Sequence, residues 1–594
     1  MANSPVEDLG DPFTYEIMVG GKNVATAFAI MHVEVNKEIN QIPTATITIA
    51  DGIPSQTDFP VSAGKEFLPG AEVEVKLGYE SKNTSVYKGV IMKHMITSDD
   101  NGSSLVVECK DKLTKMTIGR KNAFFAKKKD SDIISSLVSD GGGSATVKAT
   151  TYQHKNMMQF NATDWDFMLM RADANGMLVN VDGGKATVEP PDTSVSPEIK
   201  ASFADGSIFD FEVEMNAEDQ LEKASGYAWA DGDQKLVDGA GKASLKMPGD
   251  VTPKKLAGVL GVSEFNMQSV GNMESADLKS WASAKLTRAQ LASFTGRVTI
   301  VGSSKVVPGG MLELAGMGTH FNGNAFIRGV NHIVDDKWKT EVLLGMPADW
   351  YHESKPNVAA PPAGGLLPPV AGLQIGVVKS IEKDPDNNFR VEVKVPIMQQ
   401  DKDTVWARLS TFYATNKSGA FFYPEVNDEV VLGFLNDDPR YPIILGSVHS
   451  SKLPPGETPE KKNETKAFIS KEKIKITFDE KDKVLTLETP GGNSLAISDK
   501  DKGLALEDQN GNKIVMDNSG IEINSAKKLV LKSAQDTEIT SSAKLTEKGT
   551  SGVSVSGMKI EQKADTTFSA QGSASAELKA SGNVTVKGAM VMIN

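Results

Sequence analysis

Apolar side chains recur every eight residues in the last part of the chain, and this spacing restricts the fold more than any other feature of the sequence. One row consists of Ile521, Leu529, Thr537, Leu545 and Val553, in which only the threonine is polar. Two residues further on, a second row contains Ile523, Leu531, Ile539 and Val555. After a shift at Gly557 the same spacing restarts with Ile560, Phe568, Ala576, Val584 and Met592.

Apolar residues paired at positions i and i+2 indicate a short strand with one buried face, and the polar residues between the pairs indicate turns. One strand in every eight residues is too narrow to enclose a core within a single chain. We therefore predict that several chains wind together, most economically as a trimeric β-prism with the apolar rows on its axis. The small residues Ala574, Ala576 and Gly582 permit a narrower cross-section near the end.

Two polar or proline-rich stretches divide the 594 residues into three regions. Residues 354–372 contain two Pro-Pro pairs and a Gly-Gly pair, which disfavour both helix and strand pairing. Residues 451–466 are polar and also contain prolines. We interpret both as linkers, which separate an N-terminal region (1–353), a middle domain (373–450) and a C-terminal tail (467–594).

The N-terminal region is predicted to be mainly β with a few helices. Alternating residues such as those at 44–49 (TATITI) have the two-residue period of half-buried strands. One helix is expected to begin after Ser131, which we assign as its N-cap, and to end at Gly141-Gly142-Gly143. Another is expected to begin after Thr163 and to end at Gly176. A third helix is expected at about 275–294.

Two stretches of this region resemble each other. Pro69-Gly70 precedes alternating apolar residues, a polar turn and Tyr87-Lys88-Gly89-Val90. Pro308-Gly309 precedes the same arrangement, which ends in Phe326-Ile327-Arg328-Gly329-Val330. The match is degenerate, but it predicts two copies of one β-barrel-like unit.

The size of the middle domain and the spacing of its turn residues are typical of a small closed barrel of the OB type. Glycine and proline separate short apolar runs along its 78 or so residues. The predicted strands are 375–381, 389–395, 405–409, 429–434 and 443–448.

Composition excludes several classes of protein. The formal net charge of −13 argues against a general nucleic-acid binder, and the single cysteine, Cys109, excludes an intrachain disulfide. Residues 1–13 do not have the pattern of a signal peptide, and no apolar run approaches the 18 or so residues of a membrane span. We therefore expect the protein to be made in the cytoplasm.

No group of residues predicts an enzyme, a metal site or a cofactor. The tail contains no His, Cys, Arg, Tyr or Trp, and we interpret its carboxylates (Asp479, Glu480, Asp482, Asp499 and Asp501) as residues of solvated turns. His320 and His332 are twelve residues apart, which is not a metal-ligand spacing, and we expect structural roles for them. Cys109 is expected to be a buried, inert thiol, and Lys127-Lys128-Lys129 a solvated loop.

Several motifs resemble the VgrG spike proteins of contractile injection machines. In the middle domain these are Gly376-Val377-Val378, Asp384-Pro385, Trp406-Ala407-Arg408, Asp428-Glu429-Val430 and Asp438-Pro439-Arg440-Tyr441-Pro442. Thr163-Asp164-Trp165-Asp166-Phe167, followed by Arg171 and Asn175-Gly176, is similar to phage baseplate hub proteins. The closing residues 586–594 resemble the distal end of the β-helical spikes.

This resemblance implies a homotrimer in which the N-terminal region is a hub on a hexameric inner tube, next to other baseplate proteins. Three chains with two similar units each would present six units to that tube. The resemblance also implies three kinds of partner: a PAAR-type cone protein at the tip, cargo effectors, and a target membrane that the spike contacts transiently. It implies no nucleic-acid partner. On firing, the spike would be released or translocated into the target. For the cone protein we expect docking on Met590, Val591, Met592, Ile593 and Asn594.

The function predicted from the sequence is thus that of a structural spike that punctures an envelope and is not an enzyme. The alternative from another class is a phage or cell-surface adhesin that uses the β-prism as a stalk. A β-helical polysaccharide enzyme is a more distant third.

Overall fold

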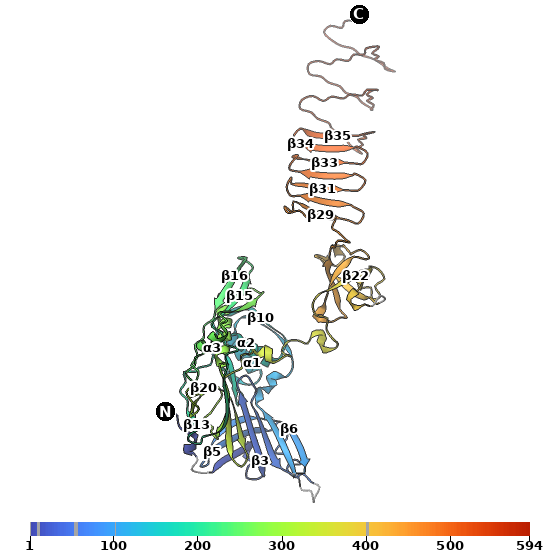
Figure 1. Cartoon of the computed structure of the whole chain (residues 1–594). Coiled ribbons are helices and arrows are strands. Elements are labelled where there is room, and N and C mark those ends of the chain that lie inside the picture. Colours follow the sequence, from blue (N-terminus) through green and yellow to red (C-terminus); the bar gives the residue numbers. More distant parts are fainter. Residues whose placement is uncertain (1, 9–11, 53–57, 101, 400–402, 594) are drawn as a thin grey trace. The chain divides into compact units, whose positions relative to one another are not determined.

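The computed structural model describes residues 2–8, 12–52, 58–100, 102–399 and 403–593. Contacts divide the chain into two compact units, residues 1–448 and 449–594. Both consist mainly of β-strands, as the sequence predicted, and α-helices occur in the first unit only among the described residues. Figure 1 shows the fold of each part, and each is described here by itself.

The N-terminal region contains two five-stranded repeats with the same topology. The first repeat consists of β3 (Ile30–Glu38), β4 (Thr44–Ala50), β5 (Glu72–Tyr79), β6 (Lys82–Asp99) and β7 (Gly102–Lys110). The second consists of β14 (Ile208–Met215), β18 (Phe294–Val301), β19 (Met311–Ala315), β20 (Gly323–Val334) and β21 (Trp338–Leu344). The spatial order is β3-β4-β7-β6-β5 in one and β14-β18-β21-β20-β19 in the other, and every neighbouring pair is antiparallel.

The two predicted Pro-Gly positions are equivalent in these repeats. Gly70 donates its N–H to the carbonyl of Ile91 at 2.9 Å, and Gly309 donates to the carbonyl of Ile327 at 2.8 Å. Both glycines have positive φ, 99° and 86°, a conformation that glycine adopts without a steric penalty. The pairing of β3 with β4 is interrupted by a bulge after Ile30, and that of β14 with β18 by a bulge after Ile208. The internal repeat predicted from the sequence is therefore present, and its two copies share the left-handed glycine and the bulge.

The repeats are joined edge to edge in one sheet, because β20 also pairs with β3. Further strands extend the sheet: β1 (Phe13–Val19) pairs with β5 and with β2 (Lys22–Asn23), and β13 (Ile199–Ser202) pairs with β19. Each repeat has its own apolar core. Val35, Ile47 and Val107 belong to the first core, and Val298, Leu312 and Val342 to the second.

A mixed segment lies between the repeats in the sequence. Its elements are β8 (Lys121–Lys129), α1 (Asp130–Asp140), β9 (Ser144–Val147), β10 (Gln153–Ala162), α2 (Asp164–Ala174), β11 (Leu178–Asp182) and β12 (Lys185–Glu189). The prediction for α2 is confirmed, because the Thr163 side chain accepts the N–H of Asp166 at 3.0 Å and Gly176 has φ 64°.

Two details of α1 differ from the prediction. Ser131 lies within the first turn and is not the N-cap, which is Lys129. The carboxylate of Asp132 accepts the N–H of Lys129, so an acidic residue at the third helical position satisfies that donor in place of a serine cap. Lys127-Lys128-Lys129 end strand β8 and do not form a loop, because His154 and Gln153 of β10 pair with Lys128 and Lys129.

A second insert separates β14 from β18. It consists of β15 (Ala224–Ala230), β16 (Lys235–Ala240), α3 (Pro253–Leu260), β17 (Phe265–Ser269) and α4 (Ser275–Leu291). Helix α4 confirms the third predicted helix, with Leu278, Ala282 and Leu286 buried. After β21 the short helix α5 (Tyr351–Ser354) leads into the proline-rich stretch.

The middle domain is a closed five-stranded barrel in the order β22-β23-β24-β28-β27, as the sequence predicted. Its strands are β22 (Gln374–Ser380), β23 (Val391–Lys394), β24 (Val405–Leu409), β27 (Glu429–Phe434) and β28 (Pro442–Ser447); a small hairpin of β25 (Ala414–Thr415) and β26 (Ser418–Gly419) stands outside the barrel order. Val378, Val391 and Leu432 lie in its core.

The tail has two parts. Residues 465–524 form an antiparallel meander of β29 (Thr465–Ile469), β30 (Lys475–Asp479), β31 (Val484–Glu488), β32 (Ser494–Ser498), β33 (Gly503–Glu507), β34 (Lys513–Asp517) and β35 (Gly520–Asn524). Beyond β35 the chain continues in open turns, and residues 525–593 contain no strand (Figure 1). The eight-residue rows begin with Ile521 and Ile523 of β35, the last paired strand, and continue beyond it.

Candidate functional site: the apolar face of the tail

Strand register places the apolar residues of the meander on one face in two cross-strand rows. The first row contains Phe468, Ile476, Leu487, Leu495, Leu506, Ile514 and Ile523. The second row contains Phe478, Leu485, Ile497, Leu504, Met516 and Ile521. The central row of the opposite face carries Ala467, Thr477, Thr486, Ala496, Ala505, Val515 and Glu522, which are small or polar apart from one valine; Ile469 and Val484 also lie on this face, at strand ends. The face that carries the two rows is called the apolar face below.

The apolar face is not covered within one chain. Leu506 is 51% exposed, Ile523 52% and Ile521 70%. A hollow of about 720 Å³ lies along the face and is lined by Ile476, Leu487 and neighbouring residues of the first row. Among the described residues of the second unit, no hydrophobic side chain is buried.

A unit of this size without a buried apolar side chain lacks the main driving force for folding. Continuous apolar surface of this extent marks a surface that another molecule covers. Because the rows continue into the eight-residue rows, where Leu529, Leu545 and Val553 are each more than half exposed, one uncovered surface extends along the tail.

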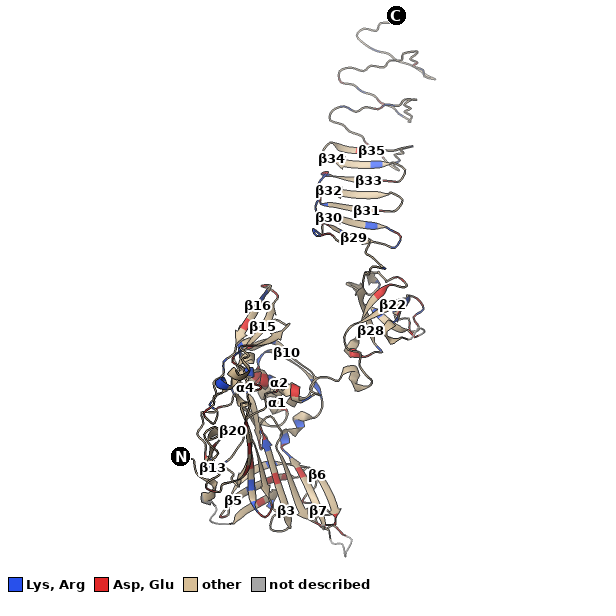
Figure 2. Cartoon of the chain, in the orientation of Figure 1, with Lys and Arg blue, Asp and Glu red and all other residues tan. Residues whose placement is uncertain are grey.

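Most charged residues of the meander lie at strand ends and in turns (Figure 2). Lys466 of β29 is the exception, because it is the cross-strand partner of Phe478 in the second row. Lys500 is 2.8 Å from Asp482, and its hydrogen bond holds the pKa of that carboxyl below its usual value. Ser498 donates its hydroxyl to Asp501 at 2.8 Å within a turn. Glu480, Asp482, Asp499 and Asp501 thus lie in turns as expected, whereas Asp479 is the last residue of β30.

The predicted docking residues at the C-terminus are strongly exposed. Met590 is 78% exposed, Val591 52%, Met592 81% and Ile593 91%, while Asn594 lies outside the described residues. They form an apolar end to the uncovered surface of the tail.

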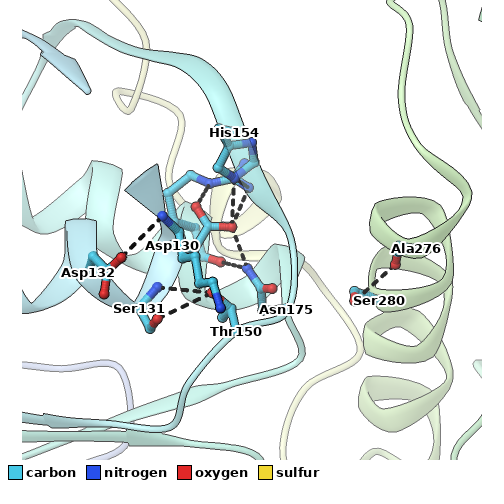
Figure 3. Close-up of polar contacts among 10 residues, drawn as sticks. Asp130, Ser131, Asp132, Thr150, His154, Asn175, Ala276 and Ser280 are labelled. Carbon is cyan, nitrogen blue, oxygen red and sulfur yellow. Dashed lines mark hydrogen bonds and ion pairs between the residues drawn. The ribbon is translucent and has the colours of Figure 1, made fainter. Parts of the chain in front are cut away.

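A buried ion-pair network in the N-terminal region was missed by sequence reasoning (Figure 3). Asp130 at the start of α1 accepts two hydrogen bonds from Arg171 of α2 at 2.7 and 2.8 Å, one from Asn175 at 2.8 Å, and contacts His154 of β10 at 3.0 Å. Burial alone would raise the pKa of Asp130, but Arg171, His154 and Asn175 together lower it to about 2. The network ties α1, α2 and β10 together.

The motif that resembles hub proteins includes Arg171 and Asn175, and their four-residue spacing puts them on one face of α2. That spacing was the signal available in the sequence. It did not identify Asp130, which is 41 residues away from Arg171.

The remaining candidates have separate environments. His332 is buried and contacts Thr340 at 2.9 Å, whereas His320 is exposed beside Asp250 at 2.5 Å. Cys109 is 1% exposed, and burial raises its pKa to about 12. No helix among the described residues is long and apolar enough to span a bilayer.

Comparison with known families matches all three regions. The family model of the Alg8 N-terminal domain matches residues 10–336, which is more than half of the chain. The chain belongs to this family. The model of the type VI secretion system/phage-baseplate injector OB domain matches residues 374–449, and that of the phage baseplate V C-terminal trimerisation domain matches residues 484–594.

Two curated relatives are VgrG proteins of Vibrio cholerae. One, the actin cross-linking toxin VgrG1, is 32% identical over 106 residues, 16% of this chain and 10% of that protein. The other, the type VI secretion system spike protein VgrG3, is 34% identical over 85 residues, 14% of this chain and 8% of that protein. The matched part thus spans about a tenth of each relative. Together with the matches to the injector OB domain and the baseplate trimerisation domain, these relatives show that the chain is similar to VgrG spike proteins.

Two solved structures are also similar. An Escherichia coli component of the type VI secretion system matches with a TM-score of 0.37 and 13% identity, covering 73% of this chain and all of that one. A tail protein from Neisseria meningitidis matches with a TM-score of 0.42 and 14% identity, covering 57% of this chain and 98% of that one. Likeness at this level carries no statement about function.

Proposed function

We propose that three copies of the chain form a spike that sits on an inner tube, punctures a target envelope and carries a tip protein and cargo. The observation that carries this proposal is the apolar face, which extends along the tail and has no cover within one chain. Three copies with these faces turned inward would bury both rows on a common axis. All meander strands would then be backed by a dry core, which favours a rod that resists bending.

The action we propose is mechanical. The hub (1–353) would dock on the tube, the OB domain (373–450) would form a neck, the linkers (354–372 and 451–466) would connect them, and the needle (467–594) would transmit force to a small tip. We propose that the protein does not act as an enzyme. The name of one relative includes a toxin activity, but the match covers only a tenth of that protein.

At the tip, the exposed residues Met590, Val591, Met592 and Ile593 fit an apolar partner surface such as the base of a PAAR-type cone protein. Replacing Met592 and Ile593 by aspartate would put charge on that surface. The expected result is loss of co-purification with the cone protein while the spike remains trimeric. Retention of the cone protein by this variant would move its docking site elsewhere.

The deciding measurement is the mass of the purified chain in solution. One chain has a mass of 63.5 kDa, so sedimentation of the full chain at three times this mass is expected. A chain ending after Lys466 lacks the apolar face and should have a lower association state at the same concentration. A full-length chain that remains monomeric would overturn the proposal.

A further inference from the structure

One charged residue interrupts the eight-residue rows of the tail. The row that starts at Ile523 consists of Ile523, Leu531, Ile539, Glu547 and Val555. The parallel row, from Ile521 to Val553, contains no charged residue. The row that restarts at Ile560 after the shift at Gly557 is uncharged as well. Glu547 is therefore the one place where these rows carry a charge.

The strand register of β35 shows which face of the chain the rows occupy. Ile521 and Ile523 lie on the apolar face, and Glu522 between them lies on the opposite face. Glu547 comes three eight-residue periods after Ile523, so the repeat sets its side chain on the side of the apolar face. The carboxylate is thus directed to the surface that other copies of the chain would cover.

Nothing within one chain neutralises Glu547. The residue is exposed and has no hydrogen bond or ion pair with any residue that the structure describes. Lys544 and Lys548, the nearest basic residues along the chain, are also exposed and have no ion pair within the described part of the chain. Outside the rows, by contrast, Glu561 is paired with Lys559. Glu547 therefore brings an uncompensated charge to the apolar face.

We propose that three copies bring their Glu547 side chains together in one layer of the tail, and that this layer makes the needle weaker at neutral pH than in mild acid. This inference rests on the proposed trimer. The adjacent row positions are the apolar residues Ile539, Leu545 and Val555, so the titratable groups that face each Glu547 are those of the other two copies. Three like charges repel one another strongly in such surroundings. Protonation removes the charge and allows one carboxyl group to donate a hydrogen bond to the next.

The layer weakens the needle without preventing its assembly, because the apolar rows continue on both sides of it. Thr537 lies in the parallel row shortly before Glu547, and Gln562 lies two residues after Ile560, so this part of the core is the most polar. A single polar position in an apolar seam is compatible with assembly at a cost in stability. At neutral pH the three chains would separate most readily at this layer.

Hydrogen–deuterium exchange of the full chain, measured on peptides that span residues 540–560, reports opening at this layer. Each variant is compared with the natural chain at the same pH. At about pH 7.5, Glu547→Gln is expected to slow exchange about tenfold, and at about pH 4.5 the two chains should differ by less than about twofold. Glu547→Leu, which restores the apolar row, should slow exchange at about pH 7.5 at least as much. The matched control is Glu522→Gln on the opposite face, which should leave the exchange unchanged at both pH values.

No slowing by Glu547→Gln at neutral pH, or the same slowing at both pH values, would overturn the proposal. Calcium chloride added to the natural chain at neutral pH should have little effect. Slowing by calcium as great as that by acid would show that a cation occupies the layer, and the proposed protonation would then be wrong. Sedimentation in the same buffers separates the two ideas, because a trimer without the pH-dependent difference refutes the role of Glu547 alone, whereas a monomer at both pH values refutes the proposed function.

Discussion

Truncation of one side chain on the apolar face should destabilise the assembled tail by a predictable amount. Leu506 is 51% exposed in the single chain, so assembly would bury about half of it. Full burial of a leucine is worth about 1.5–3 kcal/mol, so the exposed half contributes about 1 kcal/mol per chain. Leu506→Ala removes most of this three times, which gives a loss of about 3 kcal/mol per trimer before any cavity is counted.

Urea unfolding of the full chain at one fixed concentration, followed by circular dichroism, measures this loss. The matched control is Thr486→Ala on the opposite face of the meander, where a change within about 0.5 kcal/mol is expected. Leu506→Asp, which would set three carboxylates on the axis, should prevent trimer formation. Equal destabilisation by Leu506→Ala and Thr486→Ala, or a stable Leu506→Asp trimer, would refute the assignment of the apolar face.

Three further predictions concern the N-terminal region. Burial and the charge of Lys37 lower the pKa of His332 to about 3, so between this value and about pH 6.5 the unfolded chain binds a proton that the folded chain does not. The free energy of unfolding should therefore fall by up to about 5 kcal/mol from pH 6.5 toward pH 3. His332→Gln should remove most of this pH dependence in calorimetric scans between these pH values. Gly70→Ala and Gly309→Ala occupy equivalent left-handed positions and should each cost about 1–2 kcal/mol in thermal unfolding; a cost at one site only would contradict the equivalence. Cys109 should not react with a thiol reagent until the protein unfolds, and rapid modification of the native chain would show that this strand opens.

Much of the local structure follows from short patterns in the sequence. The barrel strands of the middle domain lie within about two residues of their predicted positions, because alternation and glycine or proline punctuation are both strong there. Helix α2 was predictable from Thr163 and Gly176, since both of its ends depend on local capping. The resemblance of the two Pro-Gly stretches predicted the repeat, because a tight turn restricts the residue type wherever it recurs.

Other features depend on contacts between residues far apart, which local patterns do not encode. Ser131 is a good capping residue, but Asp130 already begins the helix because its carboxylate is held by Arg171 and His154. The pairing of β20 with β3 joins segments nearly 300 residues apart, and no short motif marks it. The pairing of meander strands within one chain was not predicted either. The eight-residue period of the last rows led to the same inter-chain prism being predicted for the whole tail, including the residues before β35.

The difference between the two units suggests an order of assembly. The N-terminal unit contains buried apolar cores within one chain, so its repeats can fold before any partner is present. The described tail contains no buried apolar side chain, so its folding waits for other copies. If this is correct, a chain ending after Lys466 should still unfold in a cooperative thermal transition, because its apolar cores lie within one chain. Absence of a cooperative transition in that chain would contradict this order of assembly.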